Sequence, residues 1–232
     1  RCFNKVINKG MSKDKLKENE KKPVTSKPDD NMGLNVSGHI LIRDKDTGQE
    51  IVNKRNAIHY GNMAYIVAQA LTNQDNAFIH YMAFGNGATS VDTAGKVVYK
   101  TPRVTEGYES GANLYSRTFA KPVSNDPENL AEQKPTNKIE VVSGVSYTDL
   151  KITCTLGYSE PSDADAFDSS VSNEGNYVFD ELALFSKPTT ATGLWSTSID
   201  TSTMLTHVIF HPVQKSKNRV IEVIYTIRIQ LS

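Results

Sequence analysis

The sequence has few cysteines and no long apolar run, and both absences narrow its class. Its 232 residues include two cysteines, Cys2 and Cys154, in no CxxC arrangement. Neither a disulfide framework nor a cysteine-ligated zinc site is therefore expected. Cys154 shares a strand face with apolar neighbours in Leu150–Leu156, which predicts a small buried side chain. No apolar stretch reaches the roughly 18 residues of a membrane span, and no signal-peptide core is present, so we expect use without secretion and no membrane partner.

The chain also lacks a net charge, because 26 Lys and Arg residues balance 26 Asp and Glu residues. The balance is uneven along the chain: residues 1–30 hold nine basic and five acidic residues, and the remainder holds 17 and 21. Nucleic-acid-binding domains usually carry a basic stripe with aromatics in their folded part. The folded part here is slightly acidic, so no nucleic-acid partner is expected.

Motifs that carry familiar catalytic chemistry are missing as well. The sequence has no GxSxG, no HExxH and no cysteine–histidine nucleophile signature. Gly85-Asn86-Gly87 meets neither the GxxxxGK[ST] nor the GxGxxG spacing, so we interpret it as a tight corner with glycine at positive φ. We therefore expect no enzyme, no catalytic residue, no cofactor and no cofactor-binding residue.

No metal site is predicted from the histidines and acidic residues. His207 and His211 share one strand face, but four residues along a strand span about 13 Å, too far for one ion. The other histidines are scattered: His39, His59 and His80. Asp163–Asp168 resembles the start of a calcium loop but lacks its glycine and its final glutamate. A solvated acidic loop is the alternative for that segment.

Two further ideas about chemistry stay open at this point. Asp180 and Glu181 are adjacent in a predicted strand, so we expect them to face opposite sides and not to form a carboxylate pair. An unrecognised hydrolase would need several acidic and imidazole groups to converge, drawn from Asp163, Asp168, Glu174, Asp180 and His207. The aromatic residues predict either a sugar-binding face or half-buried strand packing: Tyr60, Tyr65, Tyr81, Tyr108, Tyr115, Tyr147, Tyr158 and Trp195.

What the sequence does contain is extended structure, most clearly at its C-terminus. From Val220 to Leu231 apolar residues alternate, with the odd positions forming a continuous apolar face. Met204–His211 is a second apolar run, separated from the first by Pro212 and a polar connection. We predict that these two runs form an antiparallel hairpin with one face buried and the other partly wet.

The rest of the chain predicts a mainly β domain with one helix. Val36–His59 has the pattern of a hairpin around an Asp44–Gly48 turn, and a helix is expected near residues 59–71, with an apolar stripe. Further strands are predicted at the following segments: Ile79–Phe84, Tyr115–Ala120, Lys138–Ser143 with Val145–Gly157, and Tyr177–Phe185 as a central strand. We predict an antiparallel sandwich or barrel.

Long polar segments divide these strands. Pro122–Asn137 and the acidic Tyr158–Asn176 are expected to be loops, and long loops of this kind are usually contact-forming. Residues 1–34 are rich in charge and poor in apolar groups, which predicts a disordered or extended tail before a single β-rich domain over residues 35–232. Residues 1–10 precede a Met-Ser-Lys that looks like an ordinary translation start.

Two stretches of the sequence carry a family resemblance. In one, Asn56–Met63 leads toward Ile79–Thr89, a strand ending in Phe-Gly-Asn-Gly; in the other, Phe179–Phe185 precedes Thr206–Lys215 and the final strand. Together they cover about a third of the chain and resemble the β modules of tailed-bacteriophage neck, tail, baseplate and fibre-attachment proteins. The resemblance carries over no functional residue.

The resemblance implies a non-enzymatic virion structural protein, made in the host cytoplasm. Its partners would be other virion proteins and copies of itself, in a symmetric ring or array. The alternative is a carbohydrate-binding β-sandwich, as in a receptor-binding or capsid-decoration module. That alternative predicts exposed aromatic rings near Trp195 or Tyr108.

Overall fold

The computed structural model describes residues 33–105, 112–125, 137–158, 160–161, 177–188 and 202–231. The chain divides into two units, Arg1–Met32 and Gly33–Ser232. Only the second unit contains described residues. The predictions for the N-terminal tail and for the two long polar loops lie largely outside these ranges.

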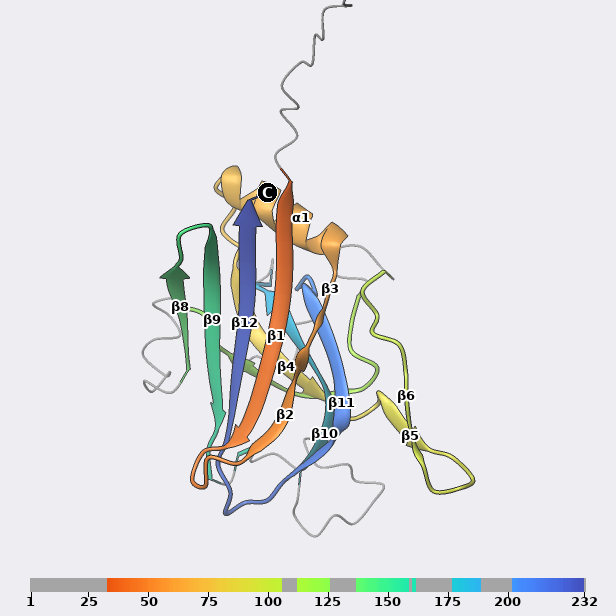
Figure 1. The fold of residues 1–232 in the computed structure, drawn as a ribbon. Coiled ribbons are helices and arrows are strands. Elements are labelled where there is room, and N and C mark those ends of the chain that lie inside the picture. The colour runs from red at the N-terminus through yellow and green to blue at the C-terminus, as the bar shows by residue number, and fades with distance from the viewer. Residues whose placement is uncertain are drawn as a thin grey trace, which may run out of the picture. The chain divides into compact units, whose positions relative to one another are not determined.

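The second unit is built on two five-stranded antiparallel sheets, one layered on the other (Figure 1). The first sheet has the order β2 (Glu50–Arg55), β1 (Leu34–Asp44), β12 (Ile221–Leu231), β9 (Tyr147–Leu156), β8 (Lys138–Ser143). The second sheet has the order β3 (Ala57–Ile58), β11 (Thr206–Lys215), β10 (Tyr177–Ser186), β4 (Ile79–Gly85), β7 (Arg117–Pro122). A small separate pair joins β5 (Thr89–Val91) to β6 (Val97–Tyr99). The predicted mainly β, sandwich-like fold is confirmed.

The core lies between the two large sheets, where alternate side chains of each strand meet. On β12 the odd-numbered residues from Ile221 to Ile227 are buried, which confirms this part of the predicted apolar face, whereas Leu231 at its end is exposed. The second sheet contributes an aromatic cluster in which Phe179 meets Phe84 edge to face at a centroid distance of 5.3 Å and stacks on Tyr177 at 5.5 Å. Each such buried side chain contributes about 1.5–3 kcal/mol to the stability, so this interface holds the two sheets together.

The predicted C-terminal hairpin is wrong, because its two strands lie in different sheets. β12 pairs along its length with β1 on one side and with β9 on the other. β11 pairs with β10 and β3. The polar connection between β11 and β12 therefore carries the chain from the second sheet to the first. A long alternating strand in the centre of a sheet needs two partners of matching length, and β1 and β9 supply them from distant parts of the sequence.

Another change of sheet occurs at Asn56, between β2 of the first sheet and β3 of the second. Strands that switch sheets in this way form the corners of a sandwich. The Asn56 amide donates a hydrogen bond to the hydroxyl of Tyr225. A Cβ atom at Gly38 would overlap the side-chain amide of Asn56, so a larger residue there would displace that amide.

The predicted helix is confirmed as α1 (Tyr60–Leu71), which crosses one end of the sandwich (Figure 1). His59 caps it, since its Nδ1 accepts a hydrogen bond from the backbone N–H of Asn62 at 3.1 Å. The buried stripe is narrower than predicted, because Ile66 is buried whereas Leu71 is 84% exposed. Among the described residues, the helix is too short and too polar to cross a membrane.

Candidate functional site

The most heavily hydrogen-bonded group in the second sheet is the carboxylate of Glu181, in the middle of β10. Its side chain is fully buried. Oε1 accepts hydrogen bonds from the backbone N–H groups of Ser116 (2.8 Å) and Gly87 (3.3 Å). Oε2 accepts from the backbone N–H of Tyr115 (3.0 Å) and lies 3.0 Å from Nε2 of His207. One carboxylate thus joins three segments that are far apart in the sequence.

The neighbouring carboxylate, Asp180, binds the same segment as Glu181, residues 87–89. It accepts hydrogen bonds from the backbone N–H groups of Ala88 (3.1 Å) and Thr89 (2.8 Å), and from the Thr89 hydroxyl. The prediction that Asp180 and Glu181 face opposite sides is therefore wrong.

The reason is a break in the strand alternation of β10. Phe179 lies opposite Val213 on β11, but Glu181 lies opposite Ile209, so the register shifts between them. Phe179 and Leu182 both belong to the core between the sheets. The two acidic residues between them consequently both lie off the core side and reach the Gly87–Thr89 segment.

His207 is held in one protonation state by its two partners. Its Nδ1 accepts a hydrogen bond from the backbone N–H of Arg103 at 2.9 Å. Its Nε2 must then carry the proton that is donated to Glu181. The imidazole is fully buried, and it is neutral in this arrangement.

Burial and hydrogen bonding shift the pKa values of the two carboxylates in opposite directions, with a different net result for each. Burial raises the pKa of Glu181, but the hydrogen bonds from His207, Ser116 and Tyr115 outweigh it and leave that pKa below its usual value. Burial also raises the pKa of Asp180, and there the hydrogen bonds from Thr89 and Ala88 do not compensate. Glu181 is therefore the charged centre of the cluster.

The glycines of Gly85-Asn86-Gly87 are explained by this cluster and not by positive φ. Among the described glycines, only Gly48 and Gly95 have positive φ. A Cβ atom at Gly85 would meet the Glu181 carboxylate and the backbone oxygen of Ser116, and one at Gly87 would meet Ser116 at 2.7 Å. The motif is thus a close approach of backbone to backbone, and the predicted positive-φ corner is wrong.

The cluster anchors the root of the β5–β6 pair, which we call the arm (Thr89–Tyr99). Asp180 binds the chain where it enters the arm, at Ala88 and Thr89. Where the chain leaves the arm, the N–H of Lys100 donates to the backbone oxygen of Ala88 at 2.9 Å, and its ammonium donates to that of Gly87 at 2.6 Å. The buried charges therefore fix the place from which the arm leaves the second sheet.

The arm presents apolar side chains to solvent. Val91 is 68% exposed and Tyr99 is 50% exposed. Figure 1 shows the arm projecting beyond β11. A two-stranded hairpin is marginally stable alone, and exposed apolar residues on one suggest that another surface covers it.

A second exposed apolar surface lies on the β8–β9 hairpin, at the free edge of the first sheet. The exposed apolar residues there are Val141, Val142 and Val145; Val141 is 66% exposed, and Val142, the next residue of β8, points to the other face of the strand. In Figure 1 this hairpin and the arm lie on opposite sides of the sandwich. The edge is partly protected, because the side chain of Asn125 bonds both the N–H and the oxygen of Ile139, at 3.2 and 2.7 Å.

His39 and His80 form hydrogen bonds with nearby side chains, and Cys154 is a buried free cysteine. His80 bonds the Ser124 hydroxyl at 2.9 Å, and His39 bonds Asn53 at 2.7 Å. Cys154 is fully buried, which confirms the predicted small buried residue, and its burial raises the pKa of the thiol to about 12. No group of three or more His, Cys, Asp or Glu side chains that could hold a metal occurs in the described part of the chain.

The hypotheses of a converging acidic site and of a sugar-binding face are tested only in part. Of the five residues in the first, Asp180 and His207 are described; Asp163, Asp168 and Glu174 lie outside the described residues, as do Trp195 and Tyr108. Among the described tyrosines, Tyr81 is buried, whereas Tyr60 and Tyr65 are exposed on α1. Tyr158 lies elsewhere, where its hydroxyl donates to Asp46 at 3.2 Å.

Lys215 is a buried charge that the sequence reasoning missed. Its side chain is enclosed at the end of β11, and its ammonium donates to the backbone oxygen of Ser216 at 2.9 Å. Burial lowers its pKa to about 8. The available signal was its position two residues after Val213, which places it on the buried face of the strand.

No family model, curated protein or solved structure matches this chain. The fold itself is a mainly antiparallel, sandwich-like β structure that carries an anchored arm with exposed apolar residues.

Proposed function

We propose that this chain is a structural protein of a tailed-phage virion, in the neck, tail or baseplate, that assembles with copies of itself into a ring or array. The observation that carries the assembly is the pair of exposed apolar surfaces on opposite sides of the sandwich, the arm and the β8–β9 hairpin (Figure 1). A closed ring of identical chains joins two different surfaces of neighbouring copies. The arm of one copy would then cover the β8–β9 hairpin of the next.

The anchored root of the arm supports this role. An arm that must meet a neighbour in one geometry has to leave its own domain in a fixed direction. Asp180 holds the chain where it enters the arm, at Ala88 and Thr89, and Lys100 ties the exit back to the same segment. The role of the buried acids Asp180 and Glu181 is thus positioning, and Glu181 is enclosed away from any solute. The virion context rests on the resemblance of Ile79–Thr89 and Phe179–Phe185 to phage β modules. Other virion proteins would be further partners.

Complementary variants test the head-to-tail contact. Val91→Glu places a charge on the arm, and Val141→Glu places one on the hairpin. We expect wild-type chain to form a closed oligomer in native mass spectrometry and each variant to be monomeric. A mixture of the two variants should form a dimer, because it retains one intact arm facing one intact hairpin. Leu71→Glu, on the exposed end of α1, is the matched control and should assemble normally.

Two results would refute the proposal. One is a wild-type chain that stays monomeric at every concentration; the other is a mixture of Val91→Glu and Val141→Glu that forms no dimer although wild type assembles. The virion context is tested by the mass spectrometry of purified particles. There we expect the chain in a fixed copy number per particle, and its absence from particles would exclude the virion role.

A further inference from the structure

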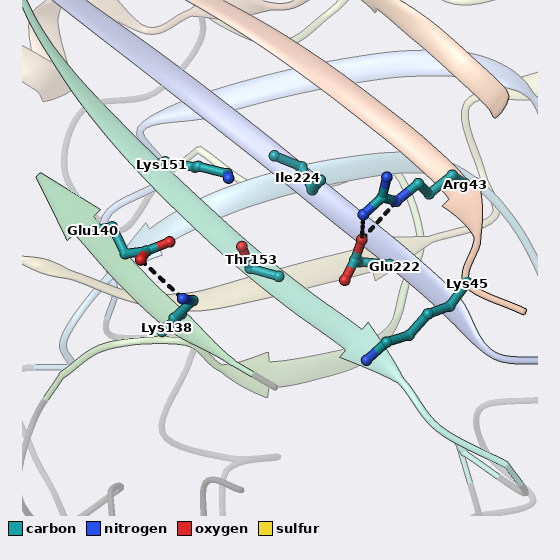
Figure 2. Close-up of a pocket in the computed structure, with 8 residues that line it drawn as sticks. All are labelled: Arg43, Lys45, Lys138, Glu140, Lys151, Thr153, Glu222 and Ile224. Atoms are coloured by element: carbon teal, nitrogen blue, oxygen red, sulfur yellow. Dashed lines mark hydrogen bonds and ion pairs between the residues drawn. The ribbon is translucent and has the colours of Figure 1, made fainter. Parts of the chain in front are cut away.

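The outer face of the first sheet carries a groove that the assembly role does not use. It has a volume of about 220 Å³ and lies across β1, β12, β9 and β8 (Figure 2). Its lining includes four basic side chains, Arg43, Lys45, Lys138 and Lys151, and two acidic ones, Glu140 and Glu222. The groove therefore carries a formal surplus of two positive charges, although the chain as a whole is neutral.

The two positive charges without an acidic counterpart in the groove are those of Lys45 and Lys151. Arg43 pairs with Glu222, with its Nε 2.6 Å from the carboxylate, and Lys138 pairs with Glu140 at 2.8 Å. Within the described residues, neither Lys45 nor Lys151 forms an ion pair. The hydrogen bond from Lys138 lowers the pKa of Glu140, and the charge of Lys151 lowers it further, which indicates a positive potential in the groove.

The floor of the groove supplies a hydroxyl group. Thr153 lies between Ile224 of β12 and Lys138 of β8 in the sheet register. Figure 2 shows it between the two ion pairs, with Lys151 and Lys45 toward either end of the groove. Its residue is 9% exposed, and its hydroxyl has no hydrogen-bond partner among the described residues. One largely buried hydroxyl and two ammonium groups without an ion-pair partner in the described part of the chain therefore line the same groove.

We propose that this groove binds a phosphate or sulfate group. Two ammonium groups and one hydroxyl match a compact dianion with several acceptor oxygens, and charge-assisted hydrogen bonds are the stronger kind. A planar carboxylate would favour the fork of a guanidinium group, but the only arginine here is already held by Glu222. The group could be the free ion or a monoester on a small sugar, and both offer the same oxygens.

The test is a titration of the full chain with inorganic phosphate at constant ionic strength, followed by the amide NMR signals of Thr153 and Ile224. We expect these signals to move saturably. Lys45→Gln and Lys151→Gln should each weaken binding about tenfold, the loss of one charge-assisted hydrogen bond, and Thr153→Val should weaken it about threefold. The matched control is Lys217→Gln, an exposed lysine between β11 and β12 that belongs neither to the groove nor to the arm, and it should leave the affinity unchanged.

A second titration, with glucose 6-phosphate, distinguishes the two sources. Tighter binding than inorganic phosphate would support a sugar monoester as the ligand, and weaker or equal binding would support the free ion. The proposal is overturned if phosphate moves neither signal, if acetate binds as tightly as phosphate, or if Lys217→Gln weakens binding as much as Lys151→Gln. None of these outcomes depends on the oligomeric state, so the groove and the assembly role are tested separately.

Discussion

Replacing Glu181 by glutamine tests whether the buried carboxylate holds the root of the arm. Each carboxylate oxygen accepts two hydrogen bonds, Oε1 from Ser116 and Gly87, and Oε2 from Tyr115 and His207. Glutamine keeps one oxygen and turns the other position into a donor, so two buried N–H groups lose their acceptor. Each orphaned donor costs about 1–3 kcal/mol, so Glu181→Gln should lower the free energy of unfolding by about 2–6 kcal/mol.

A change of tautomer at His207 cannot repair this loss. If Nε2 gave up its proton to accept from the new amide, Nδ1 would have to carry the proton and face the N–H of Arg103. The unfolding free energy is measured by urea denaturation, followed by far-ultraviolet circular dichroism. Glu140→Gln removes an exposed ion pair with Lys138 and is the control, and it should lower the free energy of unfolding far less than Glu181→Gln does.

Amide hydrogen exchange adds a local measurement on the same variant. Exchange at the root of the arm should rise more than exchange in β12, because the backbone segments that Glu181 holds lose hydrogen bonds while the central strand keeps both its partners. A Glu181→Gln protein as stable as Glu140→Gln, with unchanged exchange at the root of the arm, would show that the carboxylate does not anchor this region.

Two further substitutions test the packing. Gly85→Ala should lower the unfolding free energy by about 1–3 kcal/mol, since its Cβ would meet Glu181 and a backbone oxygen. Gly157→Ala is the control: the nearest contact of its Cβ is at 3.5 Å, so the unfolding free energy should change little. Equal losses in the two variants would contradict this explanation. Lys215 has a folded pKa of about 8 against 10.5, so the unfolded chain binds more protons between these values and stability should rise as the pH increases from 8. Lys215→Met should remove that rise and stabilise the protein at pH 7 by about 1–3 kcal/mol. Urea denaturation at pH 7 and pH 9 measures both effects, and a less stable Lys215→Met at pH 7 would refute them.

Periodicity predicted the strands well because it records which face of each strand is buried. Alternation and turn residues predicted the buried face of β12 and the central position of β10. They also predicted two hairpins, β1–β2 and β8–β9. Alternation does not record which strand lies alongside. Proximity in sequence favoured β11 as the partner of β12, but the chain crosses between the sheets there, and β1 lies beside β12 over eleven residue pairs.

The anchor could not be predicted by treating strand residues one at a time, yet its parts are visible in the sequence. Asp180 and Glu181 interrupt an otherwise apolar strand, and a buried carboxylate requires several donors. The side chains of Thr89 and His207 supply two of these donors and backbone N–H groups supply the others, so a backbone segment with small residues has to approach closely. Gly85 and Gly87 meet that requirement. Two adjacent acids in an apolar strand, together with a Gly-x-Gly after another strand, therefore predict contact between the two segments, and the register shift after Phe179 lets both acids take part.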